Sequence, residues 1–169
     1  MSQGYRMLGF VVIVILYAVI GLMAAAGTIL IVRKTLTAKA EQIFYAIFLI
    51  MIAAFYLAFA AYYGAAGAWR METGVVVVFA VIGLLGARFP FFLIVGYSLH
   101  GLWDLLHELQ AHGVRSLFEP SQLTMIPLAY GVFCAAFDFC IAAYSYKRRA
   151  EWNAAWRAAP HGSEHRSDV

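Results

Sequence analysis

The chain has 169 residues, of which 64% are hydrophobic and 12% are charged, and its formal net charge is +3 at pH 7. A soluble domain is typically about a quarter charged, so this chain carries too few charges to cover a surface in water. Its 13 Phe, 10 Tyr and 4 Trp also exclude a disordered chain, because disordered chains are poor in aromatic residues. This composition predicts an all-α integral membrane protein whose solvent is the lipid bilayer.

Five apolar runs follow one another along the chain. A helix needs about 20 apolar residues to cross the roughly 30 Å of hydrocarbon in a bilayer. The predicted transmembrane helices are 8–32, 42–63, 73–87, 90–110 and 124–146, and together they form one transmembrane domain over residues 1–146. The third run is short, and Pro90 suits the first turn of a new helix, so we expect a tight turn around Arg88. The alternative is one kinked helix over residues 74–109, which gives a bundle of four helices.

The basic residues predict an orientation. With five spans, one side of the membrane collects nine of them: Arg33, Lys34, Lys39, Arg88, Lys147, Arg148, Arg149, Arg157 and Arg166. The other side has three, which are Arg6, Arg70 and Arg115. Because Lys and Arg gather on the cytoplasmic side, we expect a multi-pass protein of the cell membrane with its N-terminus outside and its C-terminus in the cytoplasm.

Residues 147–169 are predicted to form a cytoplasmic basic tail. Trp152 and Trp156 lie one turn apart in it, as in a short amphipathic helix at the membrane interface, and residues 160–169 have the composition of a disordered end. Nothing in the chain suggests a folded domain that would present basic residues to nucleic acid, so the expected partner is the lipid bilayer. A chain this small would need to form a homo-oligomer, or join another membrane protein, to act as a transporter.

A polar stripe interrupts the fourth apolar run, in residues 98–108. At about 100° per residue, Asp104 lies about 40° to one side of His100, and His107 lies about 20° to the other. These three ionisable residues therefore share one narrow helix face, and Glu108 lies at its edge.

Asp138 is a fourth ionisable residue, in the middle of the fifth run. At about 1.5 Å per residue, His100 lies about 15 Å and Asp138 about 13 Å from the cytoplasmic ends of their spans, so the two meet at one level. Tyr130 and Cys134 share the helix face of Asp138. The predicted buried cluster is His100, Asp104, His107 and Asp138, with Tyr130, Cys134 and Glu108 as its neighbours.

Three hypotheses account for such a cluster. An ionised side chain at the bilayer centre costs at least about 2.5–3.5 kcal/mol, so these groups must pair, line water or bind a ligand. Imidazole and carboxylate groups at this spacing can hold a divalent metal, which would activate water against an apolar substrate. The same groups can form a path for protons or ions. They can also hydrogen bond only to fix helix packing. Haem ligation would require a His on another span. The pattern does not decide whether the chain is an enzyme.

The His-x-x-x-Asp-x-x-His pattern of His100, Asp104 and His107 resembles one in small bacterial multi-span membrane proteins that are known only as domains of unknown function. More distantly, it resembles the His/Asp arrangements of membrane-embedded metal-dependent enzymes. This second resemblance implies a metal-binding role for the stripe, although those families carry further His residues on other spans and this chain does not.

Overall fold

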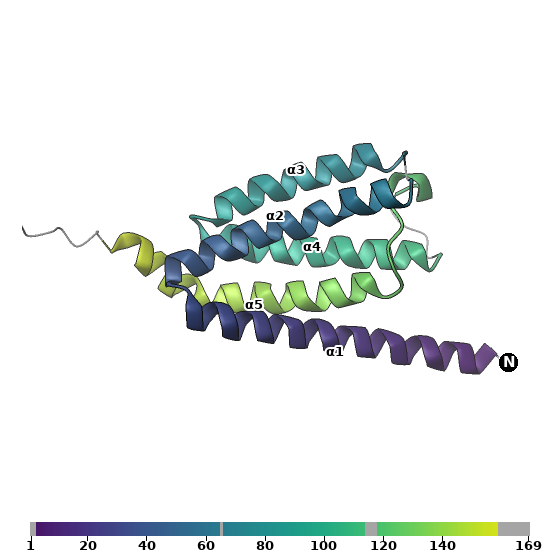
Figure 1. Ribbon diagram of the computed structural model, residues 1–169, viewed down its shortest axis with the longest axis horizontal. Helices are drawn as coiled ribbons and strands as arrows, with labels where there is room; N and C mark the ends of the chain where they lie inside the picture. Colours follow the sequence, from purple (N-terminus) through teal and green to yellow (C-terminus); the bar gives the residue numbers. More distant parts are fainter. Residues whose placement is uncertain (1–2, 65, 114–117, 159–169) are drawn as a thin grey trace, which may run out of the picture.

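A computed structural model describes residues 3–64, 66–113 and 118–158 of the chain as a bundle of helices that lie side by side (Figure 1). The elements are α1 (Gln3–Thr35), α2 (Ala38–Tyr62), α3 (Trp69–Gly86), α4 (Pro90–Ala111), the short 3-10 helix η1 (Pro120–Gln122) and α5 (Tyr130–Arg157). No strand occurs in these described ranges. The predicted all-α fold is confirmed.

Local sequence explains where these helices begin and end. The Thr37 side chain accepts a hydrogen bond from the backbone N–H of Ala40 and so caps α2. Pro90 occupies the first turn of α4, where its missing N–H costs nothing. Gly64 and Gly113, which follow the ends of α2 and α4, have φ of +66° and +73°, a conformation that other residues rarely adopt. Because α3 and α4 are separate helices, the alternative of one kinked helix over 74–109 is wrong.

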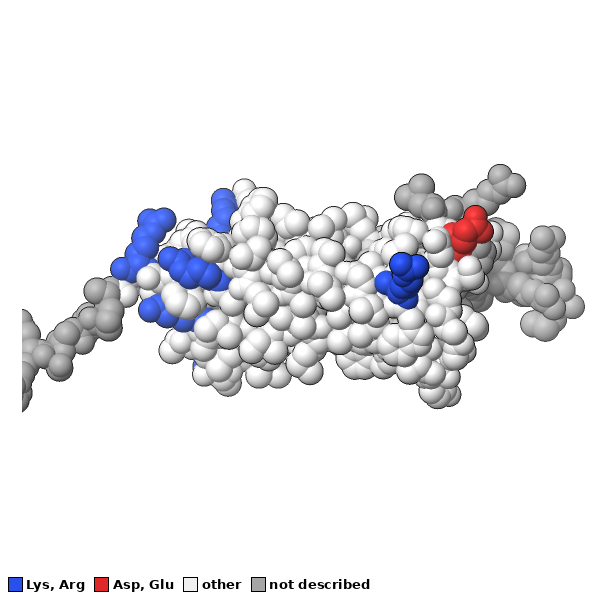
Figure 2. All heavy atoms as spheres, turned by 90° about the horizontal axis from the view of Figure 1, so that it is seen from above, with Lys and Arg blue, Asp and Glu red and all other residues white. Residues whose placement is uncertain are grey.

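Three helices in the described part of the chain are long and apolar enough to cross a membrane: Met7–Thr35 within α1, all of α2 and all of α3. Large apolar side chains are exposed along them, including Ile15, Met51 and Leu84. Contiguous exposed apolar surface of this kind marks a protein that faces lipid or a partner rather than water. On the face in Figure 2, charged side chains lie toward the two ends of the bundle, and an uncharged band separates them.

Helices α4 and α5 pack closely together, α3 packs on α2, and α1 lies along α5 at the edge of the bundle (Figure 1). Gly21 allows the close contact of α1, because a Cβ atom at this position would lie 2.3 Å from the carbonyl oxygen of Phe133 in α5. The main core joins α2, α4 and α5 through fully buried side chains such as Tyr45, Leu93 and Ile141.

Helix α5 differs from the predicted span 124–146 at both ends. It begins only at Tyr130, because Pro127 and the left-handed conformation of Ala129 (φ +57°) keep the preceding segment irregular. It then continues without a break to Arg157, and Trp152 is 0% exposed. Trp152 therefore packs inside the bundle instead of on the surface of a separate amphipathic helix. The predicted disordered end, residues 160–169, lies outside the described residues.

Candidate functional site

The candidate site forms where the backbones of α4 and α5 touch. A Cβ atom at Gly131 would lie 2.4 Å from the carbonyl oxygen of Asp104, and one at Gly101 would lie 3.4 Å from the Cβ of Asp138. Small residues allow this approach, as is common between membrane helices. The side chain of Asp138 is thereby placed directly against that of His100.

His100, Asp104 and Asp138 converge, and we refer to these three residues as the His/Asp cluster. The His100 Nδ1 atom lies 2.6 Å from Asp138 Oδ2 and 3.2 Å from Asp104 Oδ2. All three residues are at most 2% exposed, and one potential ligand atom from each lies within 4.8 Å of the others. The hydroxyl group of Tyr56 in α2 donates a hydrogen bond to Asp104 Oδ1. Two helices supply the cluster, and a third helix orients one of its carboxylates.

Acidic groups outnumber basic groups in the His/Asp cluster. Two carboxylates share one imidazole, and no Lys or Arg in the described ranges forms an ion pair with them. Even a charged His100 would leave one negative charge uncompensated, which is costly in a low-dielectric interior. His100 Nε2 and Asp138 Oδ1 are buried and have no hydrogen-bond partner among the described atoms. The cluster therefore has the negative charge to take up a cation, and two of its polar atoms lack a partner.

The structure places His107 outside the His/Asp cluster. Its Nδ1 donates to the carbonyl oxygen of Trp103 at 3.0 Å, and its Nε2 lies 3.0 Å from Oε1 of Glu72 in α3. The same Glu72 oxygen accepts the backbone N–H of Thr124 at 2.9 Å. Because both ring nitrogens of His107 are engaged, neither offers a lone pair to a metal. The buried pair of His107 and Glu72 instead joins α3, α4 and the segment before α5.

Glu108 has a structural role at the start of α5. Its Oε1 accepts the backbone N–H of Ala129 at 3.1 Å, and its Oε2 accepts that of Gly131 at 3.0 Å. A carboxylate at this place satisfies N–H groups that have no partner within the helix, and it interacts favourably with the helix dipole. Glu108 thus caps α5, and its hydrogen bonds are to the helix N-terminus instead of to the cluster.

A cavity of about 380 Å³ adjoins the His/Asp cluster, and we call it the α1–α5 cavity. His100 and Asp138 form part of its wall, together with Tyr130 and Cys134, the two predicted neighbours of the cluster. The remaining wall is mainly apolar and includes Ala24, Phe48, Ile52, Phe55, Phe133 and Phe137. Its volume lies within the range of about 300–1,000 Å³ that is usual for small-molecule sites.

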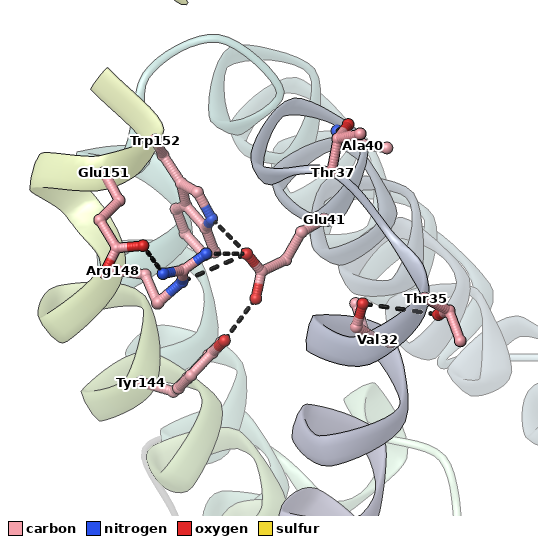
Figure 3. Close-up of polar contacts among 9 residues, drawn as sticks. All are labelled: Val32, Thr35, Thr37, Ala40, Glu41, Tyr144, Arg148, Glu151 and Trp152. Atoms are coloured by element: carbon pink, nitrogen blue, oxygen red, sulfur yellow. Dashed lines mark hydrogen bonds and ion pairs between the residues drawn. The ribbon is translucent and has the colours of Figure 1, made fainter. Parts of the chain in front are cut away.

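A second buried polar network lies near the start of α2 (Figure 3). The carboxylate of Glu41 accepts hydrogen bonds from Arg148 Nη2 at 2.7 Å, from Trp152 Nε1 at 2.8 Å and from the hydroxyl group of Tyr144. Arg148 also pairs with the exposed Glu151. Both oxygen atoms of the Glu41 carboxylate accept hydrogen bonds. The network therefore ties α2 to α5, and neither oxygen is free to bind a metal.

Sequence reasoning missed Tyr56, Glu72 and the partners of Glu41. Tyr56 lies in an apolar run that is rich in aromatic residues, where a tyrosine has no distinctive signal. Glu72 precedes the predicted third span, 73–87, by one residue, where a carboxylate is usually exposed, yet it is 0% exposed. The one available signal was its position in the first turn of α3, because a carboxylate at the end of a span can point into the bundle and be buried there.

The comparisons with known proteins assign a family and no activity. The chain belongs to a family of unknown function, DUF6010, whose model matches residues 12–151. This range includes every residue of the His/Asp cluster, and it includes the Glu41 network except Trp152, which lies one residue beyond it. No curated protein and no solved structure matches the chain.

Proposed function

We propose that this member of the DUF6010 family is a multi-pass membrane protein that binds a divalent metal ion in its His/Asp cluster. The observation that carries this proposal is the buried convergence of one imidazole and two carboxylates, with ligand atoms within 4.8 Å of one another. Two carboxylates, a neutral imidazole and a divalent cation sum to zero charge. A neutral site suits a low-dielectric interior, whereas the same residues without a cation leave a negative charge uncompensated.

The donor set fits zinc or a similar transition metal. Imidazole nitrogen and carboxylate oxygen are ordinary ligands of these ions, and three protein ligands are typical of catalytic zinc sites, which keep a fourth position for water or substrate. The hydroxyl group of Tyr56 would orient Asp104 in the way that outer hydrogen bonds orient metal ligands. His107 is excluded from the ligand set because both of its nitrogens are engaged.

The proposal includes five spans, with the N-terminus outside and the C-terminus in the cytoplasm. Support comes from α4 and α5, which lie side by side with the three helices that are apolar enough to cross a membrane (Figure 1). At about 1.5 Å per residue, α4 (22 residues) is about 33 Å long, which suffices to cross the hydrocarbon. Basic residues at the ends of α1 and α5 support the orientation. A reporter that works only in the cytoplasm should be active when it is fused at Val169. Activity of a reporter that works only outside the cytoplasm, fused at the same residue, would contradict this topology.

Elemental analysis of protein purified in detergent without chelators tests the metal site. We expect about one equivalent of a divalent transition metal in the wild type. His100→Ala and Asp138→Asn should each reduce it at least tenfold, because loss of a ligand or its hydrogen-bonding partner typically costs 10–100-fold or more in affinity. His107→Gln, a matched substitution on the same helix, should retain the metal. A wild type without metal, or equal loss in His107→Gln, would contradict the proposed ligand set.

A second candidate function is proton transfer, favoured by the contacts that link Tyr56, Asp104, His100 and Asp138 in one chain. Carboxylates and imidazoles inside membranes form proton relays in pumps and carriers. Proton flux into proteoliposomes should then fall in both Asp104→Asn and Asp138→Asn. Flux equal to that of the wild type in both variants would rule out the relay. If the variants only lower thermal stability, the cluster serves helix packing.

A further inference from the structure

Under the proposed five-span arrangement, the α1–α5 cavity opens toward the bilayer. Helix α1 packs along α5 and makes few contacts with α2, so the cavity lies where α1 and α2 stand apart. Ala24 and Thr28 of α1 form one side of the cavity, and Phe55 of α2, which is 50% exposed, forms its rim. In the five-span arrangement this rim faces lipid tails. A molecule dissolved in the membrane could therefore enter sideways without crossing water.

The walls of the cavity determine what kind of molecule fits. Most of the lining is aromatic or aliphatic, which favours a hydrocarbon tail. The one strongly polar patch is formed by His100 and Asp138, and the Asp138 Oδ1 atom is buried without a hydrogen-bond partner among the described atoms. A carboxylate oxygen without a partner requires a donor. The head of the ligand must therefore carry an O–H or N–H group.

Charge restricts the head further. The His/Asp cluster already has two carboxylates and one imidazole, and a divalent cation would bring it only to neutrality. An anionic head, such as a fatty acid carboxylate, would add an uncompensated negative charge with or without the cation. A neutral hydroxyl group donates to Asp138 without this cost.

We propose that the α1–α5 cavity binds a neutral long-chain alcohol from the bilayer, with its tail among Phe48, Phe133 and Phe137 and its hydroxyl group on Asp138. This inference names a ligand class for the proposed metal site and rests on that function, because the His/Asp cluster provides the polar wall. The alcohol is defined by chemistry alone: one hydrocarbon chain and one hydroxyl group.

Photo-crosslinking of the full-length protein in phosphatidylcholine nanodiscs tests the proposal. The probes are a long-chain alcohol with a diazirine group and a fatty acid of the same length. In the wild type we expect the alcohol to label peptides that contain Phe133, about tenfold more strongly than the acid does, which is the factor that one buried hydrogen bond supplies.

Two substitutions on α1 provide a matched pair. Ala24→Phe fills the cavity from a position that lines it, whereas Ala26→Phe places the same ring on an exposed position two residues away. Labelling by the alcohol should be lost in Ala24→Phe and retained in Ala26→Phe. Thr28→Leu, a milder filling of the same wall, should weaken labelling in the same direction if Ala24→Phe fails to fold. Equal labelling of the two phenylalanine variants, or equal labelling by alcohol and acid, would overturn the proposal.

Metal content, measured in the same preparations, separates the two proposals. Ala24→Phe should keep its metal while it loses the alcohol, since Ala24 does not contact the cluster through any described interaction. Specific labelling by the alcohol in wild-type protein that contains no metal would contradict the metal site and support the alcohol as the ligand of the cavity. A full equivalent of metal with no cavity-dependent labelling would contradict the cavity ligand alone.

Discussion

Replacement of Glu41 by alanine should strongly destabilise the bundle. The carboxylate is 1% exposed and accepts hydrogen bonds from Tyr144, Arg148 and Trp152, which all lie on α5. Glu41→Ala leaves these donors without their acceptor and leaves a buried guanidinium group with one fewer partner. Breaking a buried ion pair in this way costs about 3–5 kcal/mol. Because Arg148 retains Glu151, we expect the lower part of that range, about 3 kcal/mol.

Glu151→Ala is the matched control, because it removes a carboxylate from the same Arg148 side chain. The Glu151 side chain is 61% exposed, so its ion pair is screened by water and should contribute at most about 1 kcal/mol. The free energy of unfolding can be measured for both variants by denaturant titration in mixed micelles. A cost for Glu41→Ala that is no greater than that for Glu151→Ala would refute the role of the buried Glu41 carboxylate in tying α2 to α5.

Two further substitutions test the contacts that position the cluster. Gly131→Ala places a methyl group 2.4 Å from the carbonyl oxygen of Asp104, so it should lower the melting temperature, whereas Gly27→Ala, with nothing within 4 Å, should be neutral or stabilising by up to about 1 kcal/mol. Equal melting temperatures would show that α4 and α5 are farther apart. Tyr56→Phe removes a buried donor from Asp104 and should cost about 1–3 kcal/mol, against no measurable change for Tyr62→Phe, whose side chain is 82% exposed. Unchanged stability in Tyr56→Phe would mean that this hydrogen bond does not form.

The helices could be predicted because apolar runs and their breaks are local properties. Pro90 marks the start of α4 in the sequence as it does in the structure. The start of α5 could not be placed in the same way, because the segment after Thr124 is as apolar as a span. What keeps this segment irregular is the conformation of Ala129 and the cap from Glu108, which lies 21 residues earlier in the chain.

Only one part of the candidate site was predictable, namely the contact between residues of the consecutive helices α4 and α5. The meeting of His100 with Asp138 follows from helical rise and antiparallel packing, and the two atoms involved lie 2.6 Å apart. His107 shares the helix face of His100, yet its partner Glu72 belongs to α3, whose position beside α4 is a matter of tertiary packing. The burial of Trp152 depends in the same way on Glu41, 111 residues away. Periodicity along one helix cannot reveal such contacts.

The placement of α1 against α5 has a consequence for how the chain is made. The ribosome releases α1 first, but α5, the helix on which it packs, is synthesised last. The Glu41 carboxylate likewise has no Arg148 partner until 107 further residues have been synthesised. Only 6% of the apolar window of α1 is buried in the finished bundle, so this helix can reside in lipid alone during translation. The bundle can therefore complete its assembly only after α5 has been synthesised. A chain that stops within α5 should leave α1 unattached and be recognised as unfinished by membrane quality control.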